Sequence, residues 1–166
     1  MSKRRYAVCA ALLIAVQVVV MAMGLMVTRA TPLGSDDGIV RVRSAYGFAD
    51  TVERLRSDIA AKGILMFAVL DQRQLGAEAG VELRPSTLLL FGNPALGGQF
   101  LTSNPVAGLD WPVRLLVDED AGGQVWVSYT DFAWIARRHS ISDRAAAFAM
   151  AGNVIASITS SVSGAD

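Results

Sequence analysis

Three side chains have the type and the surroundings that acid–base chemistry needs, namely Asp71, Glu82 and His139. Asp71 ends an apolar run and Glu82 stands within an apolar stretch, so burial at a shared sheet end would raise the pKa of both carboxyl groups. His139 is the only histidine of the chain. The same residues have structural roles, because strand-end carboxylates cap turns and a histidine at a helix end complements the helix dipole. We treat all three as catalytic candidates, but for each of them we favour the structural role over the catalytic one.

Three further residues are candidates for ligand binding. Asn93 follows a glycine and precedes Pro94, a pattern typical of a helix N-terminus, where free backbone N–H groups can also meet an anion. Trp126 and Tyr129 lie in one short segment and could line an apolar pocket, although aromatic side chains also fill the core of any such domain. The sequence has no metal-ligand spacing and no phosphate-binding glycine loop. We therefore expect no metal site and no cofactor.

The N-terminal segment predicts delivery to a membrane. Lys3, Arg4 and Arg5 precede an apolar run over residues 6–27, which as a helix would be about 33 Å long and would cross a hydrocarbon core of about 30 Å. These basic residues place the N-terminus in the cytoplasm and the folded part on the periplasmic side. The run exceeds the usual length of a cleavable signal. We expect a single-pass anchor in the cell membrane, with cleavage and release to the periplasm as the alternative.

The charge of the remaining chain argues against nucleic acid as a partner. Residues 1–30 hold four of the fifteen Lys and Arg residues and none of the fifteen Asp and Glu residues, so the rest carries a net charge of about −4. Nucleic-acid binding needs clustered basic side chains. The only cysteine, Cys9, lies in the apolar run, so the folded part can form no disulfide bond within the chain.

Residues 31–38 have the composition of a linker. Residues 39–166 are long enough for one domain with its own core. Hydrophobic periodicity predicts strands at residues 39–45, 64–71, 87–92, 113–118 and 124–130. It predicts a helix that Asp50 caps and Gly63 ends, short helical pieces at 72–79, 95–102 and 131–138, and a C-terminal helix at 143–160. On the first helix, Leu55 and Ile59 would face the core.

The strand patterns predict an α+β fold. Residues 64–71 and 87–92 are apolar at almost every position, which is typical of central strands covered on both faces. Residues 113–118 and 124–130 alternate more clearly and flank a Gly-Gly turn, as in a hairpin. We therefore expect an antiparallel sheet with helices packed against it, preceded by the N-terminal transmembrane or signal helix.

Several segments together resemble the bacterial domain-of-unknown-function family 302 over about residues 40–141. They are Asp-Thr-Val-Glu-Arg-Leu at 50–55, Ala-Lys-Gly at 61–63, Leu-Phe-Gly-Asn-Pro at 90–94, Trp-Pro-Val-Arg at 111–114, Val-Trp-Val-Ser-Tyr at 125–129 and Arg-His at 138–139. The resemblance implies a compact α+β domain with an antiparallel sheet, often dimeric and without an agreed activity. Where relatives often carry an Asp-His pair, this chain has Asp71-Gln72. A role that needs that histidine is therefore not implied here.

Three hypotheses for function follow. The leading one is a non-catalytic envelope module that binds a small ligand or a partner protein, because the residues supply a core and turns but no convergent reactive set. The second is an envelope enzyme that uses Asp71, Glu82 and His139 for acid–base chemistry. The third is a structural dimerisation domain, because residues 64–71 are apolar on both sides and one helical layer covers only one. A homodimer is therefore expected.

Overall fold

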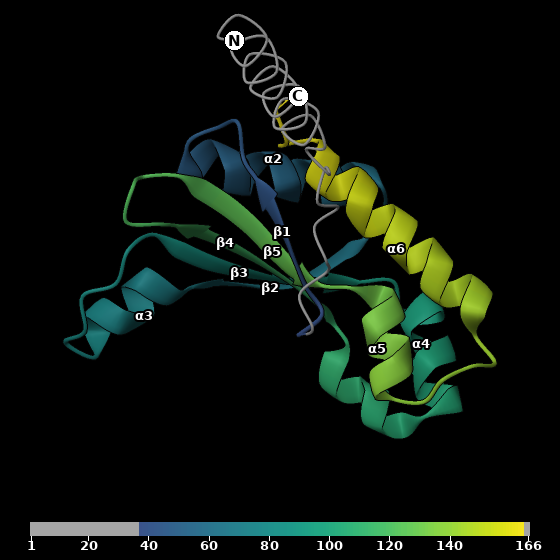
Figure 1. The fold of residues 1–166 in the computed structure, drawn as a ribbon. Coiled ribbons are helices and arrows are strands. Elements are labelled where there is room, and N and C mark those ends of the chain that lie inside the picture. The colour runs from purple at the N-terminus through teal and green to yellow at the C-terminus, as the bar shows by residue number, and fades with distance from the viewer. Residues whose placement is uncertain (1–36, 165–166) are drawn as a thin grey trace, which may run out of the picture. The chain divides into compact units, whose positions relative to one another are not determined.

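One antiparallel sheet organises residues 37–164, the part of the chain that this computed structural model describes (Figure 1). The strands are β1 (Ile39–Arg43), β2 (Leu65–Asp71), β3 (Ser86–Gly92), β4 (Val113–Glu119) and β5 (Val125–Thr130). Their order in the sheet is β1-β5-β4-β3-β2, and each neighbouring pair is antiparallel. The expected α+β fold is confirmed, and the hairpin between β4 and β5 is part of it.

The membrane segment expected at residues 6–27 lies outside the described residues. Within residues 37–164, none of the helices has both the length and the apolar character that a membrane span requires. The expected linker is described only at residues 37 and 38.

Helices α2 (Phe48–Ala61) and α6 (Ala145–Ser160) lie on one face of the sheet (Figure 1). Leu55 and Ile59 of α2 are completely buried, which confirms the helical face predicted from their spacing. The shorter helices are α3 (Gln72–Glu78), α4 (Pro94–Ser103) and α5 (Phe132–Arg138), together with a 3-10 helix, η1 (Pro105–Asp110), that the sequence did not predict. Helices α4 and α5 both contact α6.

The structure confirms the predicted C-terminal end of α2 but not its predicted N-terminal cap. Gly63 follows the helix with a φ of +67°, the left-handed conformation expected at this position. At the other end, the prediction that Asp50 caps the helix is wrong. The helix begins at Phe48, and its N-cap, Gly47, makes no side-chain cap hydrogen bond. Asp50 lies in the first turn, where its negative charge still complements the helix dipole.

Strand β2 is an edge strand, so the prediction that it is central and covered on both faces is wrong. Four of its large apolar side chains are between 38% and 54% exposed: Leu65, Phe67, Val69 and Leu70. A continuous apolar run has the same pattern in a doubly covered strand and in an uncovered edge strand. The sequence therefore identified the strand but not its place in the sheet.

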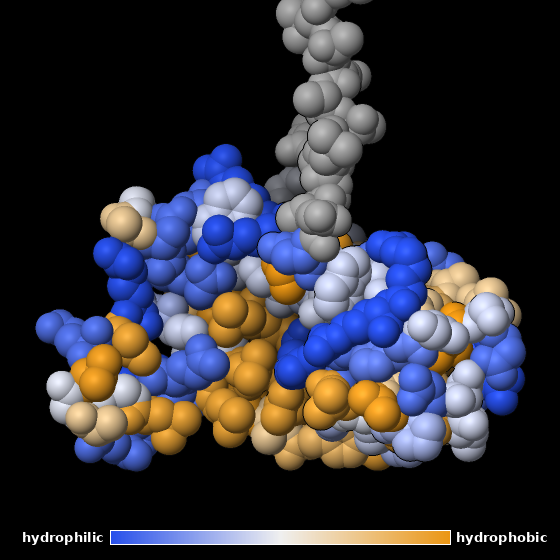
Figure 2. Space-filling model, turned by 60° about the horizontal axis from the view of Figure 1, so that its bottom comes forward, coloured by the Kyte–Doolittle hydropathy of each residue, from blue (hydrophilic) through white to orange (hydrophobic). Residues whose placement is uncertain are grey.

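The second face of the sheet has no helical layer among the described residues. Leu88, Leu90 and Leu116 point to this open face and remain partly exposed, whereas their neighbours Leu89 and Leu115 are completely buried under α2 and α6. Strand β3 lies between β4 and β2, which confirms its predicted central position. It is covered on one face only, so the prediction of cover on both faces is wrong for residues 87–92 as well. Figure 2 shows apolar side chains gathered on the side of the molecule away from α2 and α6.

Candidate functional site

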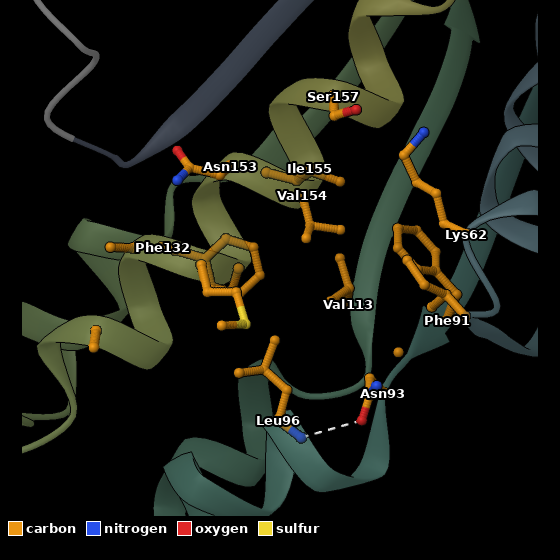
Figure 3. A pocket seen from close by; sticks show the side chains of 16 residues that line it. Lys62, Phe91, Asn93, Leu96, Val113, Phe132, Asn153, Val154, Ile155 and Ser157 are labelled. Atoms are coloured by element: carbon orange, nitrogen blue, oxygen red, sulfur yellow. Dashed lines mark hydrogen bonds between the residues drawn. The ribbon is translucent and has the colours of Figure 1, made fainter.

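An apolar pocket of about 790 Å³ lies between α6, α4 and adjacent ends of β3 and β4. Figure 3 shows apolar side chains from these elements and α5 facing a common space: Phe91, Leu96, Val113, Phe132 and Val154. Helix α6 leaves room for this space because it contributes the small residues Ala146 and Ala149 to the wall. A pocket of this size and lining is suited to a small, largely apolar molecule.

Polar groups stand at the edge of the pocket rather than in its centre (Figure 3). The Lys62 ammonium binds the Asp58 carboxylate at 2.6 Å, so the charge at this edge is already paired. Asn153 and Ser157 of α6 are exposed and complete the polar edge. Such groups can orient a ligand whose apolar part occupies the interior.

Among the predicted ligand-binding residues, Asn93 is the one that lines this pocket. Its side-chain oxygen accepts hydrogen bonds from the backbone N–H groups of Ala95 (2.9 Å) and Leu96 (3.2 Å), and Pro94 is the first residue of α4. The predicted helix cap is therefore confirmed. Because the cap occupies the Asn93 oxygen, the side chain contributes mainly by fixing this wall of the pocket.

Trp126 and Tyr129 lie elsewhere on β5 and do not line the pocket. The Trp126 Nε1–H donates to Oδ2 of Asp120 at 2.8 Å, and the Arg41 guanidinium lies 4.8 Å from the centre of its ring. Tyr129 is half-buried, and this burial raises the pKa of its hydroxyl. Tyr129 packs against the core and belongs to the lining of a separate groove on the sheet, and the structure does not bring Trp126 or Tyr129 to Asn93.

The three catalytic candidates are separated. Asp71 caps α3, where its Oδ1 accepts a hydrogen bond from the Gln74 backbone N–H at 2.9 Å. Glu82 is exposed in a polar pocket that includes neither Asp71 nor His139. His139 follows α5, and α3 and α5 lie at opposite ends of the sheet (Figure 1). The arrangement gives Asp71 the structural role favoured from the sequence and forms no common site.

His139 has a partner that sequence reasoning missed. Its Nε2 lies 2.6 Å from Oδ2 of Asp110, and both side chains are under 5% exposed. The Asn104 side chain donates to the backbone oxygen of His139 at 2.8 Å, which fixes the end of α5. Asp110 stands 29 residues before His139, so no local pattern links the two.

Two arginines share the carboxylate of Asp110. Arg114 Nη2 lies 2.5 Å from Oδ1, and Arg138 Nη1 lies 3.2 Å from Oδ2. Asp110 ends η1 and Arg114 lies on β4, so the helical spacing rule for side-chain pairs does not link them in the sequence. Within residues 37–164, no hydroxyl or thiol side chain hydrogen-bonds to His139 in the manner of a nucleophile. In the described residues, Asp110 thus orients His139, but no nucleophilic side chain is hydrogen-bonded to the imidazole.

The chain matches a known protein family and a solved structure of that family. Residues 40–158 match the family model described as "Domain of unknown function DUF302", which extends beyond the segment recognised from the sequence and includes most of α6. The crystal structure of an uncharacterized conserved protein DUF302 from Bacillus stearothermophilus has the same fold. Its TM-score is 0.68 at 17% sequence identity, over 75% of this chain and 98% of that chain.

Two curated relatives carry the name fluoride-specific ion channel FluC 1, one from Brucella suis and one from Brucella abortus. Each is 38% identical over 115 residues, which are 68% of this chain but only 45% and 43% of the respective relative. The chain therefore spans less than half the length of these relatives.

Proposed function

Since this chain belongs to the DUF302 family, whose description assigns no function, we propose from its geometry that it is a non-catalytic envelope module. Its ligand is a small apolar molecule that binds in the pocket beside α6. The observation that carries this proposal is the pocket of about 790 Å³ with an apolar interior and a polar edge. The separation of Asp71, Glu82 and His139 favours binding over the acid–base alternative.

The proposal includes a place at the cell membrane. The apolar run at residues 6–27 is long enough to anchor the chain, with the domain on the periplasmic side or, after cleavage, released there. The relatives named as fluoride-specific ion channels support this location, because their matched segment belongs to chains named for a membrane function. The proposal assigns no ion conduction to this chain.

The neutral apolar dye N-phenyl-1-naphthylamine tests the pocket. The domain of residues 37–166 suffices, because the DUF302 crystal structure shows this fold in a chain of hardly more than the domain. We expect dye fluorescence to rise on binding and the rise to be lost in Ala149→Trp, whose ring would fill the pocket. Ala60→Trp on the exposed side of α2 is the control and should bind as the parent does. Equal binding by both variants would remove this pocket as the site.

A second candidate function is dimerisation through β2. This edge strand exposes large apolar side chains and carries no charge before Asp71, so two copies can pair antiparallel without placing like charges opposite each other. The other edge strand, β1, carries Arg41 and Arg43, which would oppose such pairing. Helix α3 buries none of its residues in its own chain and would add contacts next to the paired strands.

A further inference from the structure

A groove of about 420 Å³ crosses the open face of the sheet, on the side opposite the apolar pocket. Its floor is formed by Leu88 and Leu116, with the hydroxyl side chains Ser128 and Thr130 beside them. Three charged residues line it: Arg41, Arg114 and Asp118. The groove is therefore apolar in the middle and charged towards its ends.

Strand β4 sets the length of this groove. Arg114, Leu116 and Asp118 alternate with buried residues and so point to the same face. The α-carbons of Arg114 and Asp118 are roughly 13 Å apart for an extended strand. At the Asp118 end, the carboxylate pairs with Arg41 at 2.8 Å, which leaves that end without excess charge.

Next to the Arg114 end, Arg138 adds positive charge from outside the groove lining, through the carboxylate of Asp110 that it shares with Arg114. Arg114 and Arg138 both donate hydrogen bonds to Oδ1 of Asp110, so their two guanidinium groups share one carboxylate oxygen. His139 contacts the other oxygen, Oδ2, which Arg138 also binds. One negative charge thus faces two permanent positive charges, and both Asp110 oxygens are occupied. The cluster attracts an anion rather than a further cation.

Asp110 fixes the two arginines in position, and both keep exposed surface and free N–H donors. The Asp110 side chain is 2% exposed, whereas the side chains of Arg114 and Arg138 are 47% and 45% exposed. A guanidinium has five N–H donors, and in the described hydrogen bonds each of these arginines uses only one nitrogen. Planar guanidinium groups with free N–H donors suit a carboxylate, which accepts two parallel hydrogen bonds.

We propose that Arg114 and Arg138, positioned by the buried Asp110, bind the carboxylate of a small monocarboxylic acid whose short apolar chain lies along Leu116 and Leu88. A single carboxylate matches the single uncompensated charge of the cluster. The apolar chain matches the half-buried leucines, because covering them removes apolar surface from water. This site is distinct from the pocket beside α6 and extends the binding role proposed above.

Isothermal titration of the 37–166 domain with octanoate, octanol and acetate tests both halves of the ligand. We expect octanoate to bind at least tenfold more tightly than octanol, which lacks the charge, and than acetate, which lacks the chain. Arg114→Gln should weaken octanoate at least tenfold and leave octanol unchanged. Arg56→Gln, an exposed arginine of α2, is the matched control and should have no effect. Equal affinities for octanoate and octanol would overturn the proposal.

Two further variants separate this site from the alternatives. Arg138→Gln repeats the charge test if Arg114→Gln fails to fold, and unchanged octanoate binding in the folded variant would contradict the proposal. Ala149→Trp should leave octanoate binding intact; loss there, with no loss in the arginine variants, would transfer octanoate to the pocket beside α6. Inorganic phosphate should compete weakly, and phosphate binding tighter than octanoate would reassign the cluster to another class of anion.

Discussion

The indole of Trp111 lies so close to Gly97 that a β-carbon added to this glycine would be 2.1 Å from the ring nitrogen. The same indole meets the ring of Phe67 edge-on, with 5.6 Å between the ring centroids. Gly97 belongs to α4 and Phe67 to β2, so one side chain joins a helix to the edge strand. The absence of a side chain at Gly97 is therefore required for this packing.

Gly97→Ala should destabilise the domain by about 1 to 3 kcal/mol, because Trp111 would have to move out of a well-packed position. Gly98→Ala, one residue along the same helix, meets no atom within 4 Å and should stabilise by about 0.5 to 1 kcal/mol. Urea unfolding of both variants measures the difference. Equal effects of the two changes would show that Trp111 does not occupy this position.

Leu55→Ala should lower the free energy of unfolding by about 2 to 5 kcal/mol, because the leucine is completely buried between α2 and the sheet. Ser57→Ala, exposed on the same helix, should change it by less than about 0.5 kcal/mol. Chemical denaturation monitored by circular dichroism gives both values. A small loss for Leu55→Ala would place the core elsewhere.

The sequence predicted features that depend on neighbours along the chain. The helical spacing of Leu55 and Ile59 identified a buried face, and Asn93 before Pro94 identified a helix start, because both signals act within one or two turns. The edge position of β2 depends on the order of the strands in the sheet, which the hydrophobic pattern of a single strand does not contain. The contact of His139 with Asp110 joins segments 29 residues apart and needed the folded chain.

Asp110→Asn should destabilise the domain by about 1 to 3 kcal/mol, because it removes the charge that His139, Arg114 and Arg138 share in a buried position. Asp118→Asn is the control, since its ion pair with Arg41 is partly exposed and should contribute no more than about 1 kcal/mol. Thermal unfolding at pH 7 compares the two. A larger loss for Asp118→Asn would contradict a structural role for the Asp110 cluster.

Asp120 should contribute stability that depends on pH. The hydrogen bond from Trp126 and the backbone N–H groups of Gln124 and Gly122 lower the pKa of its carboxyl below the usual 3.8. A lowered pKa in the folded state means that the contribution is complete above the unfolded value and is lost as pH falls through the folded value. Asp120→Asn should therefore destabilise the domain more at pH 7 than at pH 2. An effect that stays constant between these pH values would refute this linkage.

The domain should be a homodimer at micromolar concentration, paired through β2. Val69 lies in the middle of this strand and is 40% exposed, so a lysine there can fold but would place a charge inside the paired edge. Sedimentation equilibrium should show a dimer for the parent and a monomer for Val69→Lys. Val106→Lys, exposed on η1 away from β2, should remain dimeric. A monomeric parent would remove the dimerisation proposal, because the apolar edge would then be stable without a partner copy.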